Sequence, residues 1–448
     1  MTTEQKQKDM LETPVQKLIL RLAVPTIISM LVTMFYNMAD TFFVGKLNSA
    51  SATAAVGVVF SYMAILQAIG FMFGHGAGNF ISRSLGQGDK EKASQMASSS
   101  FIFSLVAGGI LTVLGLIFIR PFSLFLGSTE TILPYTIDYL RYILIGSPYM
   151  MASFVLNNQL RFQGSASFAM IGIVSGAVLN IALDPLLMFT FDLGIQGAAI
   201  ATAFSQFVSF IILLIGTKQG GNLHLQLKNV RVKWWVFKEI LRGGIPSLFR
   251  QGLASISAIC LNTVAGGLGG DAAIAGMSIV SRVMMFANSA MIGFGQGMQP
   301  VVGFNYGAGK YDRVKKSFWF CVKWAVLFLG LIAVIGFVFA PTIVGWFQKD
   351  EAVLAVAKWA LRFQCLTFVA NAWIVPTNMM LQAVGKTFGA SLLAASRNGI
   401  LFLPPLYLLT YWFGITGLQL AQPIADLLSA LLAVPLTINF LREIKKGH

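Results

Sequence analysis

Charged residues are scarce in this chain. Only 11% of its 448 residues are Asp, Glu, Lys or Arg, compared with roughly 25% in an ordinary soluble domain. Because 56% of the residues are hydrophobic and 37 are Phe, a water-soluble fold of this length is excluded. The length is enough for about twelve helices of roughly 20 apolar residues joined by short loops. The composition therefore predicts an all-α polytopic membrane protein.

Motifs for enzymatic or nucleotide chemistry are also lacking. The three cysteines, Cys260, Cys321 and Cys365, lie in apolar stretches without CxxC spacing, which argues against a disulfide framework or a zinc site. The glycine-containing segments at residues 86–89 and 307–310 do not have the spacing of a phosphate-binding loop. We therefore expect neither an enzyme nor a nucleotide partner, and no cofactor.

Long apolar runs are what the sequence has instead. Polar residues, Gly and Pro separate twelve of them, and a polar stretch from Lys218 to Lys233 divides the runs into two sets of six. We expect helices near residues 15–45, 51–80, 93–119, 131–159, 166–190 and 195–217, and then near 236–268, 271–304, 314–340, 352–384, 388–413 and 416–441.

The basic residues collect in alternate loops. The net charge is +15, and Lys and Arg concentrate in the cytoplasmic loops of membrane proteins. One set of loops holds basic clusters such as Lys90 with Lys92 and Lys315 with Lys316, whereas the other holds little more than Lys46. This pattern predicts a multi-pass protein of the cell membrane with both termini in the cytoplasm. It also explains the positive charge without a nucleic-acid partner.

The two halves of the chain repeat each other. Ala23-Val24-Pro25 recurs as Gly244-Ile245-Pro246 after 221 positions, and Gly194-Ile195-Gln196-Gly197 recurs as Gly414-Ile415-Thr416-Gly417 after 220. Each copy holds six spans, so the copies share one orientation. We expect two parallel-repeat six-helix bundles around a central cleft, formed by residues 1–217 and 236–448 and joined by a cytoplasmic linker at 218–235.

Three acidic residues stand out inside the predicted spans, namely Asp40, Asp184 and Asp426. Each costs about 2.5 to 3.5 kcal/mol at a helix centre, so their positions are informative. Asn180 precedes Asp184 by one helical turn, and Thr33, Tyr36, Asn37 and Asp40 share one helix face. Pro185 cannot donate a hydrogen bond to the carbonyl group of Ile181, which leaves that oxygen available.

Polar residues of other helices are expected at the same depth. Counted from the outer ends of their spans, Thr202 and Tyr139 lie about two turns deep, close to the predicted level of Asp184. Oxygen ligands of this kind suit a hard cation such as Na⁺, and two neighbouring acids suit a shared proton equally well. A hydrogen-bond network that only holds the bundle together is the structural alternative.

Asp426 belongs to the second half, where Pro404 replaces Asp184. Asp426 and Arg397 lie at equal predicted depths on neighbouring helices, so we expect a structural ion pair. Arg282 is the other candidate partner. His75, in a glycine-rich segment near a predicted cytoplasmic end, is interpreted as a hydrated interface residue rather than a proton relay.

The chain resembles the multidrug and toxic compound extrusion (MATE) family, in particular its DinF-like branch. The resemblance covers nearly the whole chain and rests on residues 23–25, 40–45, 82–86, 180–185 and 194–199, together with a linker followed by Gly244-Ile245-Pro246. It implies twelve helices in two lobes. It also implies a coupling site in the amino-terminal lobe, at the positions that match Asp40, Asn180, Asp184 and Thr202, with Tyr139 beside them.

The function implied by the resemblance is export of amphipathic, often cationic drugs in exchange for inward Na⁺ or H⁺. We expect lipophilic cations as substrates, in a cavity with aromatic, Met and acidic side chains that includes Tyr36, Asn37 and Met34, and a monomer in the bilayer. The alternative is a flippase for lipid-linked precursors from the same superfamily. Neither the coupling ion nor the natural substrate follows from the sequence.

Overall fold

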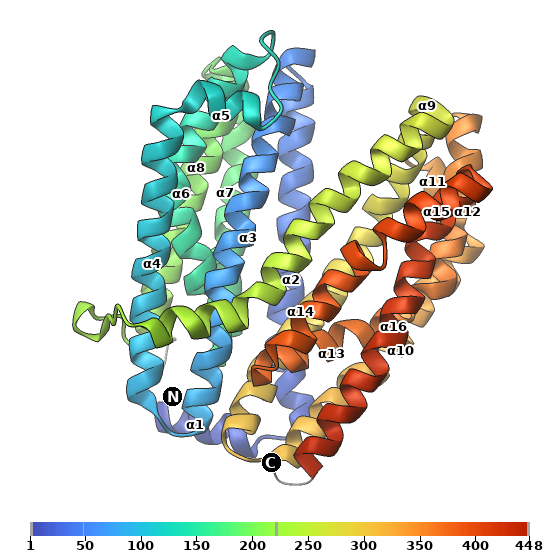
Figure 1. The fold of residues 1–448 in the computed structure, drawn as a ribbon. Helices are drawn as coiled ribbons and strands as arrows, with labels where there is room; N and C mark the ends of the chain where they lie inside the picture. Colours follow the sequence, from blue (N-terminus) through green and yellow to red (C-terminus); the bar gives the residue numbers. More distant parts are fainter. Residues whose placement is uncertain (1–2, 48, 220–222, 446–448) are drawn as a thin grey trace. The chain divides into compact units, whose positions relative to one another are not determined.

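The computed structural model describes residues 3–47, 49–219 and 223–445, and within these ranges all regular elements are helices (Figure 1). Helices suit a lipid environment because they satisfy their own backbone hydrogen bonds. The long helices of the first half are α2 (Val15–Gly45), α3 (Ala50–Gly86), α4 (Lys90–Ile117), α6 (Leu133–Phe162), α7 (Ala166–Pro185) and α8 (Gly194–Gln219). Shorter elements are α1 (Thr3–Glu12), α5 (Ile119–Phe125), the π-helix η1 (Leu186–Thr190) and the 3₁₀ turn η2 (Leu227–Asn229).

The second half begins with the 74-residue helix α9 (Trp234–Gly307). It breaks at Gly269 and Gly270, and Gly270 has a φ of +58°, a conformation that glycine adopts without steric cost. The following elements are α10 (Tyr311–Val338), α11 (Ala340–Gly345), α12 (Glu351–Phe368), α13 (Asn371–Val384), α14 (Thr387–Ala395), the π-helix η3 (Ser396–Ile400), α15 (Leu403–Phe413) and α16 (Ile415–Lys445).

The number of spans agrees with the sequence. In the described ranges nine helices are long and apolar enough to cross a membrane, and the bent pair α12 and α13 supplies a tenth crossing. Helix α9 is broken into two arms, and each arm is one crossing, which adds an eleventh. Helix α6 is the twelfth, because its 30 residues are long enough for a span although it is more polar than the others. This gives the twelve predicted helices.

The chain folds into two compact units. The amino-terminal unit contains Met1–Thr13 and Val24–Gly244, and the carboxyl-terminal unit contains Pro14–Ala23 and Ile245–His448. Helices α2 and α9 each pass from one unit to the other just before a proline, Pro25 or Pro246. These two prolines occupy equivalent positions in the sequence repeat. Each unit is described below by itself.

The outer face of α4 shows how a helix of the amino-terminal unit meets lipid. Exposed apolar side chains recur every three or four residues, which places them on one stripe of the helix. The side chains are 53% to 66% exposed and belong to Val106, Ile110, Val113 and Ile117. The opposite face carries small buried residues, among them Ser104, Gly108 and Gly115.

The first arm of α9 packs tightly across α3 within the amino-terminal unit. Gly76 of α3 lies directly against the backbone of Ile240, and Gly243 lies against the backbone of Gly76. A Cβ atom at either glycine would collide with main-chain atoms. Only glycine therefore permits the two helices to approach this closely.

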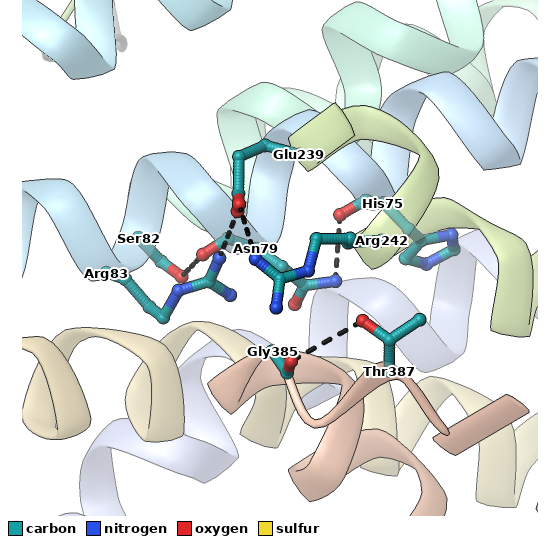
Figure 2. A network of polar contacts seen from close by, with 8 residues as sticks. All are labelled: His75, Asn79, Ser82, Arg83, Glu239, Arg242, Gly385 and Thr387. Carbon is teal, nitrogen blue, oxygen red and sulfur yellow. Dashed lines mark hydrogen bonds and ion pairs between the residues drawn. The ribbon is translucent and has the colours of Figure 1, made fainter. Parts of the chain in front are cut away.

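An ion-pair network holds α9 to α3 beside this crossing (Figure 2). Arg83 Nη2 donates to Glu239 Oε2 at 3.2 Å, and Arg242 Nη1 donates to Glu239 Oε1 at 3.2 Å. Asn79 and Ser82 contribute bonds within α3, because Asn79 Nδ2 donates to the His75 carbonyl and Ser82 Oγ to the Asn79 carbonyl. Glu239 thus links the two helices.

We predict that Gly76→Ala destabilises the protein, because overpacking against a rigid backbone costs about 1 to 3 kcal/mol. Gly109→Ala is the matched control, since Gly109 also lies within a helix of this unit but has no atom within 4 Å of an added Cβ. It should be neutral or stabilising by about 0.5 to 1 kcal/mol. The difference in stability is measured by thermal unfolding of both detergent-solubilised variants, with the folded fraction at each temperature determined by size-exclusion chromatography. Equal midpoints would contradict the tight crossing.

Candidate functional site

Five of the polar side chains predicted from the sequence come together inside the amino-terminal unit. They belong to four helices, and each is at most 2% exposed. Asp40 lies on α2, Tyr139 on α6, Asn180 and Asp184 on α7, and Thr202 on α8. The side chains expected at a similar depth in the membrane therefore share one location, which we call the polar site.

Asn180 connects the polar groups of α7 and α8. Its Nδ2 donates to Asp184 Oδ1 at 3.3 Å and to Thr202 Oγ1 at 3.2 Å. Asp40 is close enough to Asp184 for an electrostatic interaction, and Tyr139 interacts with both acids and with Thr202. These contacts hold the side chains in a defined arrangement.

Several oxygens of the polar site have no hydrogen-bond partner among the described residues. They are buried atoms, and burial of an unsatisfied polar atom costs about 1 to 3 kcal/mol. The atoms are Asp40 Oδ1, Asn180 Oδ1, Asp184 Oδ2 and Ser205 Oγ. Unsatisfied oxygens from carboxylate, amide and hydroxyl groups match the ligand set of a hard cation, and the carboxylates are also sites for a proton.

Ser205 was not predicted from the sequence. It is 1% exposed and follows Thr202 by three residues on α8, so both hydroxyls lie on one helix face. Serine is common in transmembrane helices, so the presence of a serine at this position did not indicate a functional site. Its spacing from Thr202 is the pattern that would have identified it.

Helix α7 changes its geometry directly after Asp184. The α-helix ends at Pro185 and continues as the π-helix η1, in which the N–H group of Phe191 donates to the carbonyl of Leu186 at 3.0 Å. Proline removes one backbone donor, and single π-helical turns occur frequently at functional sites. The polar site therefore lies at a local irregularity of its helix.

A cavity of about 180 Å³ lies in the same unit and is lined by residues of α2, α3, α6, α7 and α8. Tyr36 and Asn37 line it, as predicted from the sequence, whereas Met34 is not among its lining residues. Tyr36 also interacts electrostatically with Asp40 and Asp184. Its ring therefore connects the cavity with the polar site.

The chemistry of the cavity differs from the expectation. Its methionines are Met63 and Met150, and its lining includes aromatic rings but no acidic residue. Sequence reasoning missed the polar side chains that line it, namely Gln67, Ser153, Asn157, Gln206 and Ser209. Gln206 follows Thr202 by one helical turn, so the same spacing argument would have found it.

In the carboxyl-terminal unit Asp426 has several partners. Arg397 Nε donates to Asp426 Oδ1 at 2.8 Å, and Gln422 Nε2 donates to the same atom at 3.0 Å. Asn371 Nδ2 donates to Asp426 Oδ2 at 3.3 Å. The side chain of Asp426 is fully buried, and its partner is Arg397 rather than Arg282.

The profile of the MatE family matches residues 25–186 and again residues 246–408. The chain belongs to the MatE family. The two matches also confirm the internal repeat, and membership makes the chain a multi-pass membrane transporter.

Relatives of this MatE protein match it over nearly their whole length. The Multidrug export protein MepA of Staphylococcus aureus (strain MRSA252) is 29% identical over 437 residues, which are 96% of this chain and 95% of the relative. A relative of the same name from Staphylococcus saprophyticus is 28% identical over 94% of this chain and 93% of its own length.

Solved structures agree with the fold. A crystal structure of MATE in complex with MaL6 has a TM-score of 0.92 at 27% identity, covering 98% of this chain and 99% of that one. An outward-facing multidrug resistance MATE family transporter of the MOP superfamily also has a TM-score of 0.92, at 26% identity and 98% coverage of both chains.

The repeat of this MatE protein relates the cavity of one unit to the ion pair of the other. Arg397 lies 220 positions after Ala177, and Asp426 lies 220 positions after Gln206. Ala177 and Gln206 line the cavity of the amino-terminal unit. The carboxyl-terminal unit therefore has an ion pair where the amino-terminal unit has space for a ligand.

We predict that Asp426→Asn alone lowers the unfolding free energy, because it leaves the Arg397 charge without its buried counter-ion. Breaking one side of such a pair costs about 3 to 5 kcal/mol, whereas removing both charges is often nearly neutral. The double variant Asp426→Asn with Arg397→Gln should therefore recover part of the loss. Thermal unfolding in detergent tests this cycle. A single variant with intact stability but abolished transport would show that Asp426 acts in transport instead.

Proposed function

We propose that this protein is a secondary active antiporter that exports amphipathic, often cationic drugs in exchange for inward Na⁺ or H⁺. The observation that carries the proposal is the polar site, where Asp40 and Asp184 are buried together and each keeps an oxygen without a hydrogen-bond partner in the described part of the chain. Two buried carboxylates require a positive ion or a proton to be stable in the membrane. The relatives' names as multidrug export proteins support the drug as cargo.

The coupling ion acts through the charge of the polar site. A ligand shifts a conformational equilibrium only by its difference in affinity between the states. With a cation or proton bound, Asp40 and Asp184 are closer to neutral, and the helices can close around them. Without it, their negative charge favours water and a cationic substrate in the adjacent cavity. Tyr36, which lines the cavity and interacts with both acids, transmits the effect.

Export by alternating access follows from this scheme. The two six-helix bundles correspond to the predicted ranges 1–217 and 236–448, except that residues 14–23 group with the carboxyl-terminal unit and residues 236–244 with the amino-terminal unit. The segment 218–235 is their cytoplasmic linker, and both termini lie in the cytoplasm at the cell membrane. The protein works as a monomer and needs no cofactor besides the coupling ion. Asp40, Asn180, Asp184 and Thr202 form the ion site, and Tyr139 lies beside them.

The substrate should be a flat, lipophilic cation such as ethidium. Aromatic faces attract a cation by about 0.5 to 2 kcal/mol, and the flexible side chains of Met63 and Met150 tolerate varied shapes. We predict that cells expressing the protein accumulate several-fold less ethidium than cells with an empty vector. Equal accumulation, with the protein shown to be in the membrane, would contradict the proposed substrate class.

Asp184→Asn tests the ion site in the same assay. The substitution preserves the shape of the side chain but fixes it in a neutral form, so the variant should reach the membrane and lose coupled efflux. Asp192→Asn, the same change at an exposed position eight residues away, is the matched control and should retain wild-type efflux. In everted vesicles, separate collapse of the Na⁺ and proton gradients identifies the ion, and efflux that survives both collapses would favour a flippase.

A further inference from the structure

The linker segment, which we define as residues 223–238, is fixed to the amino-terminal unit by its backbone. The N–H group of Gln226 donates to Ser98 Oγ at 3.2 Å, and that of Arg231 donates to Ser99 Oγ at 2.8 Å. Both serines belong to α4, and the segment lies beside this helix in Figure 1. The linker segment therefore has a defined position on the unit and is not a free tether.

Three large apolar side chains of the linker segment are exposed. Leu227 is 80% exposed, Val232 75% and Trp234 74%. Other apolar residues of the segment are packed inward, among them Leu223 and Val236, which are buried. A segment that buries part of its apolar residues and still exposes three large ones is typical of a surface that meets a membrane or a partner.

The charge of the linker segment has one sign. Lys228, Lys233 and Lys238 are exposed, and Arg231 is partly exposed. Residues 193–238 contain no Asp or Glu. Basic residues that alternate with exposed apolar residues are the pattern of a segment that lies in the interface of an anionic membrane.

The level of the linker segment along α4 favours lipid over a soluble acidic partner. Val106, which begins the exposed apolar stripe of α4, follows Ser99 by seven residues, or about 10 Å at 1.5 Å per residue. The ring of Phe237 stacks on that of Phe103, three residues before Val106, with 4.5 Å between the ring centroids. Interfacial segments bury apolar side chains about 5 to 10 Å into the boundary between headgroups and acyl chains. The linker segment therefore lies at the depth of the lipid headgroups, where Trp is enriched.

We propose that the linker segment binds anionic phospholipids at the surface of the bilayer. Lys228, Lys233 and Lys238 contact the headgroup phosphates, and Leu227 and Trp234 contact the upper part of the acyl chains. Lysine suits this position because its stem lies along apolar surface while its ammonium group stays in the polar layer. The site lies outside the polar site and the cavity, and it does not depend on the proposed drug export.

A fluorescent probe measures the depth of the linker segment and identifies its lipid partner. The dye NBD is attached to Leu227→Cys and, as a control, to Gln87→Cys, an exposed position in the turn between α3 and α4, with the natural cysteines replaced by Ala. The full-length proteins are reconstituted in vesicles of phosphatidylcholine and phosphatidylglycerol, in which one of the two lipids carries a nitroxide quencher high on its acyl chain.

The probe at residue 227 should be quenched at least twofold more strongly by labelled phosphatidylglycerol than by labelled phosphatidylcholine. The probe at residue 87 should be quenched weakly by both lipids. Equal quenching of the probe at residue 227 by the two lipids would overturn the proposal. Quenching there as weak as at residue 87 would also overturn it, and would indicate a soluble acidic partner instead.

Two pairs of substitutions test the role of charge in the same vesicles. Lys228→Gln with Lys233→Gln should remove the preference for phosphatidylglycerol, as should 1 M NaCl, which shortens the Debye length to about 3 Å. Lys90→Gln with Lys92→Gln removes two exposed charges from the start of α4 and should leave the preference unchanged. A preference that persists in the linker variant, or that both variants lose equally, would overturn the proposal.

Native mass spectrometry provides a second measurement on proteins that retain their natural cysteines. After incubation in mixed micelles of the two lipids, the linker variant should retain fewer phosphatidylglycerol molecules than the wild type, and the variant at residues 90 and 92 should match the wild type. Equal retention by all three proteins would overturn the lipid site. Neither measurement involves a drug or an ion gradient, so a negative result leaves the proposed drug export in place.

Discussion

A buried charge in a lipid environment must be compensated, and the arrangement of both units depends on how this is done. A carboxylate that remains unpaired at the centre of a helix is expensive, whereas one with a close cation and further hydrogen bonds is stable. Asp426 is stabilised by a close cation and further hydrogen bonds, with Arg397, Gln422 and Asn371 as its partners. Asp40 and Asp184 are compensated less completely, because each retains a buried oxygen with no hydrogen-bond partner among the residues that the structure describes.

This difference between the halves gives them different roles. The sequence repeat places Asp426 where the first half has Gln206, and Pro404 where it has Asp184. In the amino-terminal unit the result is a cavity of about 180 Å³ beside two acids, with Tyr36 between the cavity and the acids. In the carboxyl-terminal unit the equivalent positions are occupied by the ion pair. One half therefore has a cavity at this position, and the other half has a buried ion pair.

Much of the architecture could be predicted because lipid imposes simple rules on a sequence. Apolar runs gave the twelve helices, and the predicted break between residues 268 and 271 lies at Gly269 and Gly270. Helical spacing predicted that Asn180 lies next to Asp184, and counting residues from the ends of the spans predicted that Thr202 lies at the same depth. Hydrogen bonds from Asn180 to both residues confirm these predictions. These features depend on length and period alone.

Other features depend on packing between helices and could not be derived in this way. The burial of His75 follows from its contact with Arg161, which is 86 residues away in the sequence. The polar lining of the cavity by Gln67 and Gln206 and the exclusion of Met34 follow from how five helices rotate against one another. A helix rotation of this kind is set by side-chain packing, and no periodicity in a single segment reports it.

The proposed competition between the drug and the coupling ion through Asp184 is tested most directly by a measurement of ion release. Ethidium is added to the purified protein in weakly buffered detergent solution, and released protons or Na⁺ are recorded with a pH indicator or a sodium-selective electrode. Because binding linkage is reciprocal, wild-type protein and Asp192→Asn should release the ion when the drug binds, whereas Asp184→Asn should bind the drug without release. Undiminished release from Asp184→Asn would contradict the account and place the coupling site elsewhere.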